Sequence, residues 1–411
     1  MVNWVEAQKP ILHWLVRGAG LRQQTIEIEP GTVISMWVPK EKVMANKKKA
    51  TNKEVVPDLS SDGSRDEEED KRKKKKKQRG KEKEKPAVVL VHGFAAEGIV
   101  TWQFQFGVLV NQYEVYIPDL FFFGESTTAA ADRSPAFQAE CLAAALDKLS
   151  VRRCTAVGFS YGGMVAFKMA ELRPDLVRSL VVSGSVFAMT DSISRATLDQ
   201  LGFASSSELL MPESIKGLKA LLSVSMHKKL WFPDFLYKDY LEVMFSNRKE
   251  RAELLEGLVI SNKDAKVPSL DQVCVQVSDF FHYLHYFKVN FLFTKNVGDI
   301  STHICINLYT KNIQSFAKPT SCMLPKCGIE EHDYSWCFHF HMMQRILLLW
   351  GENDNIFNLE LAKDMKEQLG EKAILQSIKK AGHLLHVERP CAYNRHLKKF
   401  LALVKDEGTE E

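Results

Sequence analysis

The stretch at residues 154–163, Cys-Thr-Ala-Val-Gly-Phe-Ser-Tyr-Gly-Gly, constrains this chain more than any other. A β-prone run ends at Gly158, and a helix-compatible run follows soon after Ser160. A strand, a sharp turn and a helix in succession raise the central serine of Gly-x-Ser-x-Gly above the strand ends. Side chains at 158 and 162 would collide with neighbouring backbone, which explains the glycines. The pattern predicts Ser160 as a nucleophile; the alternative is a glycine-rich turn with an incidental serine.

The chain has 411 residues, of which 45% are hydrophobic, so it can bury a large core. Its charge is concentrated in one place. Residues 46–86 hold 16 Lys/Arg and 10 Asp/Glu, a local net charge of +6 in a chain of +4, so the rest carries −2. A near-neutral body argues against a general nucleic-acid binder. The basic run at 71–77 is compatible with nuclear import or with anionic lipid, although such runs are more often only solvated.

No uncharged apolar run of about 18 residues occurs, which predicts the absence of a transmembrane helix. The N-terminus lacks the basic and apolar regions of a secretory signal, and eight cysteines without such a signal indicate reduced thiols. We therefore expect a cytoplasmic protein, with peripheral membrane contact as a further possibility. Residues 10–18 predict a short apolar helix that either docks on the body or lies at a membrane surface.

Strands alternate with helical segments on both sides of Ser160. Continuous apolar runs, typical of strands covered on both faces, occur at 87–91, 114–117, 154–159, 177–182, 346–349 and 373–378. This alternation predicts an α/β fold with a mostly parallel, doubly wound sheet, preceded by a hairpin of 25–28 and 33–38. Helical runs at 206–226 and 237–260 interrupt the alternation, as an inserted helical cap would.

The chain thus divides into segments of different character. We predict an N-terminal helix and first strands (1–43), a disordered charged insert (44–86), the first part of the core (87–186), a helical cap (187–268), an atypical insert (269–344), the second part of the core (345–405) and a tail (406–411). The blocks of like charge in the first insert cannot bury enough apolar surface to fold.

The atypical insert matches neither of its flanks. Residues 270–344 hold five of the eight cysteines and six of the twelve histidines. Three interpretations stay open: a larger lid, a segment foreign to the native fold such as a translated non-coding stretch, or a zinc site formed by Cys322, Cys327, His332, Cys337, His339 and His341. We favour the second and predict that the segment is dispensable, because its removal leaves a normal cap-to-strand connection. No metal or other cofactor is expected.

Ser160, Asp354 and His383 each follow a predicted strand, and carboxyl ends of parallel strands meet at the ligand-binding edge of a sheet. A serine hydroxyl is too weak an acid to attack unaided, so His383 would take its proton. Asp354 would orient the imidazole and stabilise its cation. Glu352 and Asp191 remain alternatives for the acid.

A tetrahedral intermediate needs fixed donors for its oxyanion, and the backbone N–H groups of Phe94 and Tyr161 are the natural pair. His386 competes with His383 for the role of base, but its place in an apolar run favours a packed side chain. His92 is expected to brace the loop that carries Phe94. Asp119 is expected to bond its own turn.

The chain resembles the serine α/β-hydrolase superfamily, and within it the proteins with an inserted helical cap that are labelled monoacylglycerol-lipase-like. The resemblance rests on Val-His-Gly-Phe (91–94), Pro-Asp-Leu (118–120), Gly-Phe-Ser-Tyr-Gly-Gly (158–163), Trp-Gly-Glu-Asn-Asp (350–354) and Gly-His-Leu-Leu-His-Val-Glu-Arg-Pro (382–390). It implies the α/β-hydrolase fold, a triad in the chain order Ser, Asp, His, and a lipid-like ester substrate such as monoacylglycerol.

Three departures qualify the resemblance. Phe122 stands where many relatives carry a glycine, so that loop is shaped differently. Glu388 stands five residues after His383, where relatives with acyltransferase activity tend to have Asp. Epoxide hydrolases and dehalogenases of this fold have an aspartate at the position of the central serine, so Ser160 argues against both activities. A carbon–carbon bond hydrolase with the same triad, and a small-molecule receptor with little or no turnover, remain alternative functions.

Overall fold

The computed structural model describes residues 3–43, 85–268, 270, 273–275, 340–342 and 344–406. The charged run at 71–77 lies outside these residues, and so do the candidate zinc ligands Cys322, Cys327, His332, Cys337 and His339. Of His341, only the backbone is described. Residues 1–270 and 344–411 form one compact unit, and residues 271–343 form a second. In the second unit, β10 (Val273–Val275) pairs antiparallel with β11 (Phe340–Met342).

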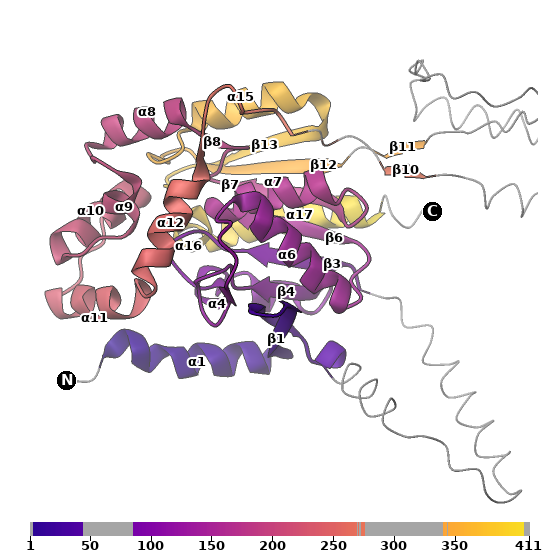
Figure 1. Cartoon of the computed structure of the whole chain (residues 1–411), viewed down its shortest axis with the longest axis horizontal. Helices are drawn as coiled ribbons and strands as arrows, with labels where there is room; N and C mark the ends of the chain where they lie inside the picture. The colour runs from indigo at the N-terminus through magenta and orange to yellow at the C-terminus, as the bar shows by residue number, and fades with distance from the viewer. Residues whose placement is uncertain are drawn as a thin grey trace, which may run out of the picture. The chain divides into compact units, whose positions relative to one another are not determined.

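Within the described part of the first unit, nine strands form one sheet (Figure 1). Its main path runs β1-β2-β4-β3-β6-β7-β12-β13, and β5 pairs with β2. The strands are β1 (Leu21–Glu29), β2 (Thr32–Pro39), β3 (Ala87–Val91), β4 (Glu114–Pro118), β5 (Thr127–Thr128), β6 (Cys154–Phe159), β7 (Val177–Ser183), β12 (Arg345–Gly351) and β13 (Ala373–Ile378). From β4 to β13 the pairing is parallel, whereas β1, β2 and β5 pair antiparallel. The predicted mostly parallel sheet is confirmed.

Alternate residues of the central strands belong to two different cores, because successive side chains of a strand point to opposite faces. In β3, Val89 and Val91 join one cluster with residues of α6 (Pro135–Lys148), α7 (Tyr161–Leu172) and α15 (Leu359–Leu369). Val88 and Leu90 join the other cluster, with residues of α4 (Gly98–Thr101), α5 (Phe106–Leu109) and α17 (Pro390–Asp406). Helices thus cover both faces, which explains why these strands are apolar throughout.

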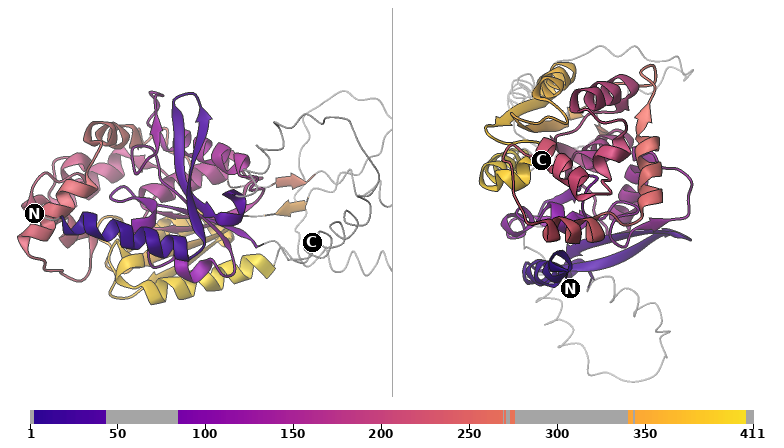
Figure 2. Two further views of the ribbon diagram at one scale, coloured as in Figure 1. Left: turned by 90° about the horizontal axis from the view of Figure 1, so that it is seen from below. Right: turned by 90° about the vertical axis from the view of Figure 1, so that its left-hand side faces the viewer.

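The segment between β7 and the second unit contains five helices, which lie together at one end of the sheet (Figures 1 and 2). They are α8 (Asp191–Leu201), α9 (Ser206–Leu210), α10 (Ile215–Ser225), α11 (Asp234–Met244) and α12 (Arg248–Leu258). They share a small core of their own that includes Leu218, Leu221 and Tyr237. β8 (Met189–Thr190) pairs in parallel with β9 (Val259–Ile260), so the segment leaves and rejoins the body side by side.

Each of the two long helices expected in this segment is broken in two. The first stops at Leu210, and Pro212 follows; a new helix begins after Ser214, whose Oγ accepts a hydrogen bond from the Gly217 N–H at 3.1 Å. The second stops before Asn247, whose backbone is left-handed at φ 50°. The Asn247 side chain donates to the Phe122 carbonyl at 3.0 Å, so a tertiary contact fixes this break.

The N-terminal helix α1 (Trp4–Gly18) begins six residues before the position expected from Pro10. Asn3 caps it, since its side-chain oxygen accepts hydrogen bonds from the N–H groups of Val5 and Glu6, each at 3.0 Å. Leu12 and Val16 pack against the body. No helix of the described residues has the length and apolar character needed to cross a bilayer.

Candidate active site

Ser160 lies in the turn between β6 and α7, with a backbone at φ 53° and ψ −122° that non-glycine residues rarely adopt. The strain is imposed by close packing on both sides. A Cβ at Gly158 would lie 2.6 Å from the Gly163 Cα, and a Cβ at Gly162 would overlap the carbonyls of Val91 and His92. The turn therefore holds the Ser160 side chain out at the start of α7, as the sequence pattern predicts.

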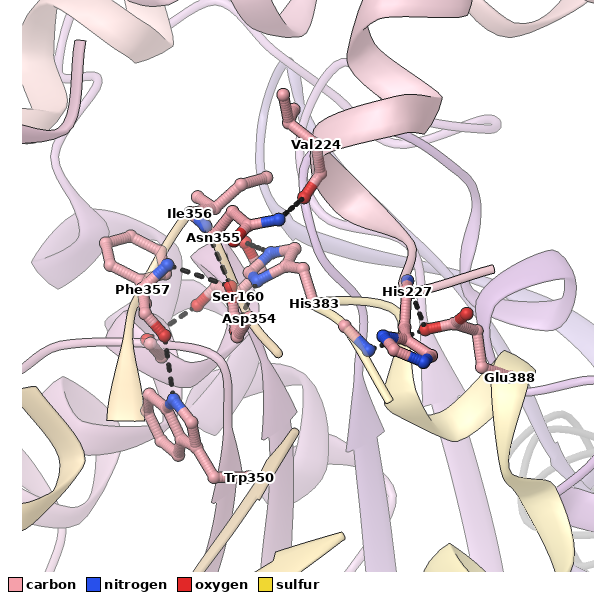
Figure 3. Close-up of polar contacts among 12 residues, drawn as sticks. Ser160, Val224, His227, Trp350, Asp354, Asn355, Ile356, Phe357, His383 and Glu388 are labelled. Atoms are coloured by element: carbon pink, nitrogen blue, oxygen red, sulfur yellow. Dashed lines mark hydrogen bonds and ion pairs between the residues drawn. The ribbon is translucent and has the colours of Figure 1, made fainter. Parts of the chain in front are cut away.

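Three side chains from distant parts of the chain form one hydrogen-bonded series (Figure 3). The Ser160 Oγ lies 3.1 Å from the His383 Nε2, and the His383 Nδ1 lies 2.9 Å from the Asp354 Oδ2. The other carboxylate oxygen of Asp354 accepts hydrogen bonds from the N–H groups of Ile356 and Phe357, both at 2.9 Å. These two bonds fix the carboxylate, so it can hold the imidazole in one tautomer and one orientation.

The alternative acids and base lie outside this series. Glu352 instead accepts a hydrogen bond from the Ser377 hydroxyl at 2.9 Å, and Asp191 is exposed in the first turn of α8. His386 is buried, and its ring packs on Phe159 with centroids 4.3 Å apart. Burial lowers the pKa of His386 to about 3.

Phe94 and Tyr161 lie next to each other, with ring centroids 6.1 Å apart. Neither backbone N–H donates a hydrogen bond to another described residue. The Tyr161 N–H belongs to the first turn of α7, where the helix itself supplies no acceptor. Both groups are therefore available for an anion that forms beside the Ser160 Oγ.

His92 and Asp119 hold the loops around these donors. The His92 Nδ1 donates to the Gly93 carbonyl at 2.6 Å, and its Nε2 accepts from the Leu120 N–H at 2.9 Å. This pair of bonds requires a neutral ring, and burial lowers the pKa of His92 to about 4. We expected Asp119 to bond its own turn, but its carboxylate accepts from the N–H of Gly98, at the start of α4, at 2.8 Å. Burial raises the pKa of Asp119 to about 8.

A cavity of about 50 Å³ adjoins Ser160 and His383. Its walls come from the body and from α8, α9 and α12. They are mostly apolar; besides Ser160 and Tyr161, three residues with a hydroxyl group line the cavity, Ser194, Thr197 and Ser206. No Lys, Arg, Asp or Glu is among the described residues of the lining. Side chains of the helical segment thus line the cavity beside the catalytic candidates.

Glu388 is a residue of the site that sequence reasoning did not assign. It belongs to the short helix α16 (Leu385–Glu388), and its carboxylate accepts three backbone N–H groups: Gly382 at 2.6 Å, His227 at 3.1 Å and Lys228 at 2.9 Å. Gly382 immediately precedes His383, whereas His227 and Lys228 follow α10. The sequence offered one signal for Glu388: it stands five residues after His383, where relatives with acyltransferase activity tend to have Asp.

Comparison with known proteins agrees with the fold. Residues 86–208 match the family model of the alpha/beta hydrolase fold. Human epoxide hydrolase 4 is 24% identical over 78% of this chain and 73% of its own length. The pimeloyl–acyl-carrier-protein methyl ester esterase of Aeromonas hydrophila is 35% identical over 24% of this chain, a match that spans only 38% of that esterase.

Among solved structures, Lip1 of Acinetobacter baumannii, a candidate lipase, aligns with a TM-score of 0.59 at 18% identity, covering 97% of both chains. At that identity the likeness concerns the fold alone. The sheet topology and these matches show the α/β-hydrolase fold. Within this fold, residues 86–208 are similar to the alpha/beta hydrolase family.

Proposed function

We propose that this protein is a serine hydrolase that cleaves carboxylic esters with an uncharged, lipid-like acyl group through an acyl-enzyme. The observation that carries the proposal is the hydrogen-bonded series from Asp354 through His383 to Ser160, which ends in an apolar cavity. The substrate class includes monoacylglycerol.

In the first half-reaction, the Ser160 Oγ attacks the ester carbonyl carbon while its proton passes to the His383 Nε2. The N–H groups of Phe94 and Tyr161 bind the oxyanion of the tetrahedral intermediate. As the intermediate collapses, the bond to the alcohol oxygen breaks and the imidazolium returns its proton to that oxygen. Water then repeats the sequence on the acyl-enzyme, releasing the acid and restoring the Ser160 hydroxyl.

The lining of the cavity favours an ester over the substrate of a carbon–carbon bond hydrolase that carries a carboxylate. A buried carboxylate requires a cation or several donors, and no Lys or Arg is among the described residues that line this cavity. Its three hydroxyls suit a neutral ester with one or two polar oxygens.

Likeness to an epoxide hydrolase raises a second candidate, ring opening of an epoxide. An aspartate nucleophile would form an ester in that reaction, which water can cleave. Ser160 would instead form an ether, which the same base cannot hydrolyse. The serine therefore favours acyl transfer over epoxide opening.

The cavity of about 50 Å³ is far smaller than the roughly 300–1,000 Å³ of ordinary ligand sites. We infer that α8 and α9, which supply much of its wall, move to admit the acyl chain.

The test compares hydrolysis of monoacylglycerols of increasing acyl length, short aryl esters, an aryl epoxide and a vinylogous diketone acid. The proposal expects turnover of the neutral esters only, abolished in S160A. Turnover confined to the epoxide or the diketone acid would overturn it. Binding of all four without turnover, in a protein that does not react with a fluorophosphonate, would favour the receptor alternative.

A further inference from the structure

The outer face of α1 is apolar although it faces solvent. Trp4, Ile11, Trp14 and Leu15 are all exposed, and Trp14 is 71% exposed. Their spacing of seven, ten and eleven residues from Trp4 places them on one side of the helix. The inner side, with Leu12 and Val16, already packs on the body. The helix thus has a second apolar stripe that the fold itself does not need.

The connection from α10 to α11 has the same character. Residues 227–232, His-Lys-Lys-Leu-Trp-Phe, are all exposed, and Trp231 is 82% exposed, the largest value among the exposed apolar side chains. Phe235, in the first turn of α11, is exposed as well. Exposed tryptophans and phenylalanines beside lysines are characteristic of segments that lie in the interface of a bilayer.

The N-terminus of α1 contacts α11, the helix that follows this connection. The Trp4 N–H donates to the Asp239 carboxylate at 2.8 Å, and the Asn3 side chain donates to the Asp239 carbonyl at 3.2 Å. Phe235 precedes Asp239 by one helical turn and shares its face of α11. Figures 1 and 2 show the start of α1 beside α11. We call the combined surface the docking face, formed by Trp4, Ile11, Trp14, Leu15, Leu230, Trp231, Phe232 and Phe235.

Two carboxylates at the docking face, Asp239 and Glu242, accept hydrogen bonds from the Trp4 backbone N–H at 2.8 Å and from the Asn3 side chain at 3.3 Å, and three lysines beside the face stand against them. Glu6 pairs with Lys9 at 3.8 Å, and Asp234 pairs with Lys219 at 2.7 Å. The exposed side chains of Lys228, Lys229 and Lys238 form no ion pair with another described residue. Lysines without an ion-pair partner beside apolar side chains complement a surface with an apolar interior and anionic headgroups.

We propose that the docking face binds the surface of an anionic lipid bilayer, with the aromatic side chains in the headgroup region and the lysines against the lipid phosphates. We choose a bilayer as the partner because the docking face combines apolar side chains with lysines. An anionic bilayer offers both an apolar interior and a continuous layer of negative headgroups, whereas a protein groove would offer mainly apolar contact. This inference does not depend on the proposed function, because binding is measured without turnover.

The first test measures co-flotation of the full chain with vesicles of phosphatidylcholine, with and without phosphatidylserine. Wild type should float with the anionic vesicles. The double variant Trp14→Ser, Trp231→Ser should lose about tenfold or more of its partitioning, because two interfacial aromatics are removed. Leu172→Ser with Leu403→Ser, two exposed apolar residues outside the face, is the matched control and should bind as wild type does. Equal flotation of wild type and the tryptophan variant would overturn the proposal.

The second test removes charge. Lys228→Gln with Lys229→Gln should weaken binding to anionic vesicles roughly fivefold per lysine and leave weak binding to phosphatidylcholine unchanged. Lys398→Gln with Lys399→Gln, exposed on α17, is the control of equal charge. An equal loss in both pairs would show that net charge alone drives binding, and the docking face would not be the site.

Two further readouts exclude other occupants and separate the inference from catalysis. If light scattering shows a dimer that the tryptophan variant abolishes, the face is a protein interface and the proposal fails.

For activity, the variant should lose hydrolysis of vesicle-borne ester while it retains hydrolysis of a soluble short ester. If the wild type binds vesicles but hydrolyses neither ester, the proposed function is contradicted and the membrane-binding inference stands.

Discussion

The Glu388 carboxylate accepts a hydrogen bond from the N–H of Gly382 at 2.6 Å, and Gly382 is the residue before the catalytic candidate His383. The same carboxylate accepts the N–H groups of His227 and Lys228 at 3.1 and 2.9 Å. It therefore joins the loop that carries His383 to the segment that enters the docking face (Figure 3). Because Glu388 does not reach the reacting atoms, we regard it as a positioning residue.

Glu388→Gln should lower kcat about tenfold with a smaller change in KM. The neutral amide offers one oxygen in place of two charged ones, and hydrogen bonds to a charged group contribute about 1.5–3 kcal/mol. Steady-state kinetics on a soluble ester measures this split. Glu360→Gln, a surface change of the same kind, is the control. An unchanged kcat, or a fall in thermal stability that accounts for the whole loss, would remove the positioning role.

Asp354→Asn should reduce kcat by about 10⁴, because an amide favours the wrong imidazole tautomer. Glu352→Gln should have little effect, since Glu352 bonds Ser377 and lies outside the series. Rates of ester hydrolysis for the two variants decide the assignment. If the two effects were reversed, Glu352 would be the acid.

Arg251→Met should destabilise the fold by about 1–3 kcal/mol. Arg251, at 3% exposure, donates to the Phe122 carbonyl at 3.0 Å and to the Met244 carbonyl at 2.7 Å, so its loss leaves buried acceptors short of donors. Urea unfolding of the variant and of the exposed control Lys249→Met measures the difference. Equal midpoints in both variants would mean that this contact between α12 and the loop at Phe122 adds nothing to stability.

His386→Phe should make the protein less sensitive to acid. The folded-state pKa of His386 is about 3, below its ordinary value of 6.5, so the unfolded chain binds a proton that the folded protein rejects. Stability is therefore lost as the pH falls from about 6.5, and His92, with a pKa of about 4, acts in the same direction. Asp119, whose pKa is raised to about 8, acts in the opposite direction.

The measurement is the difference in Tm between about pH 7 and about pH 5. It should be smaller in His386→Phe than in wild type. A phenylalanine can keep the ring contact with Phe159, so the variant is expected to fold. An unchanged difference would show that His386 does not contribute to acid sensitivity.

Local patterns predicted the elements that carry the site. β3, β6 and β13 have the expected bounds because each is a short apolar run that ends in a turn motif. The turn at Ser160 could be predicted because its flanking glycines, Gly158 and Gly162, lie too close to neighbouring backbone for any side chain. Ser160, Asp354 and His383 were expected together because parallel strands deliver their carboxyl ends to one edge of the sheet. Their catalytic roles stay a proposal.

What the sequence could not provide depends on contacts between distant segments. The left-handed backbone of Phe122, at φ 70°, is held by Asn247 and Arg251 from more than a hundred residues away. The same contact breaks a run that reads as one helix. Glu388 binds three N–H groups from two segments, and only the folded chain brings them together.

The measurement that tests the central claim most directly is labelling of the full chain with an alkyl fluorophosphonate, followed by mass spectrometry of the peptide that contains Ser160. A fluorophosphonate reacts with a serine that a neighbouring base activates. We predict one adduct, on Ser160, with ester turnover lost in parallel. S160A should take up no label and should lose about 10⁴–10⁶ in kcat while remaining folded. A folded wild type that takes up no label at Ser160, or an S160A protein that hydrolyses esters at the wild-type rate, would contradict the account.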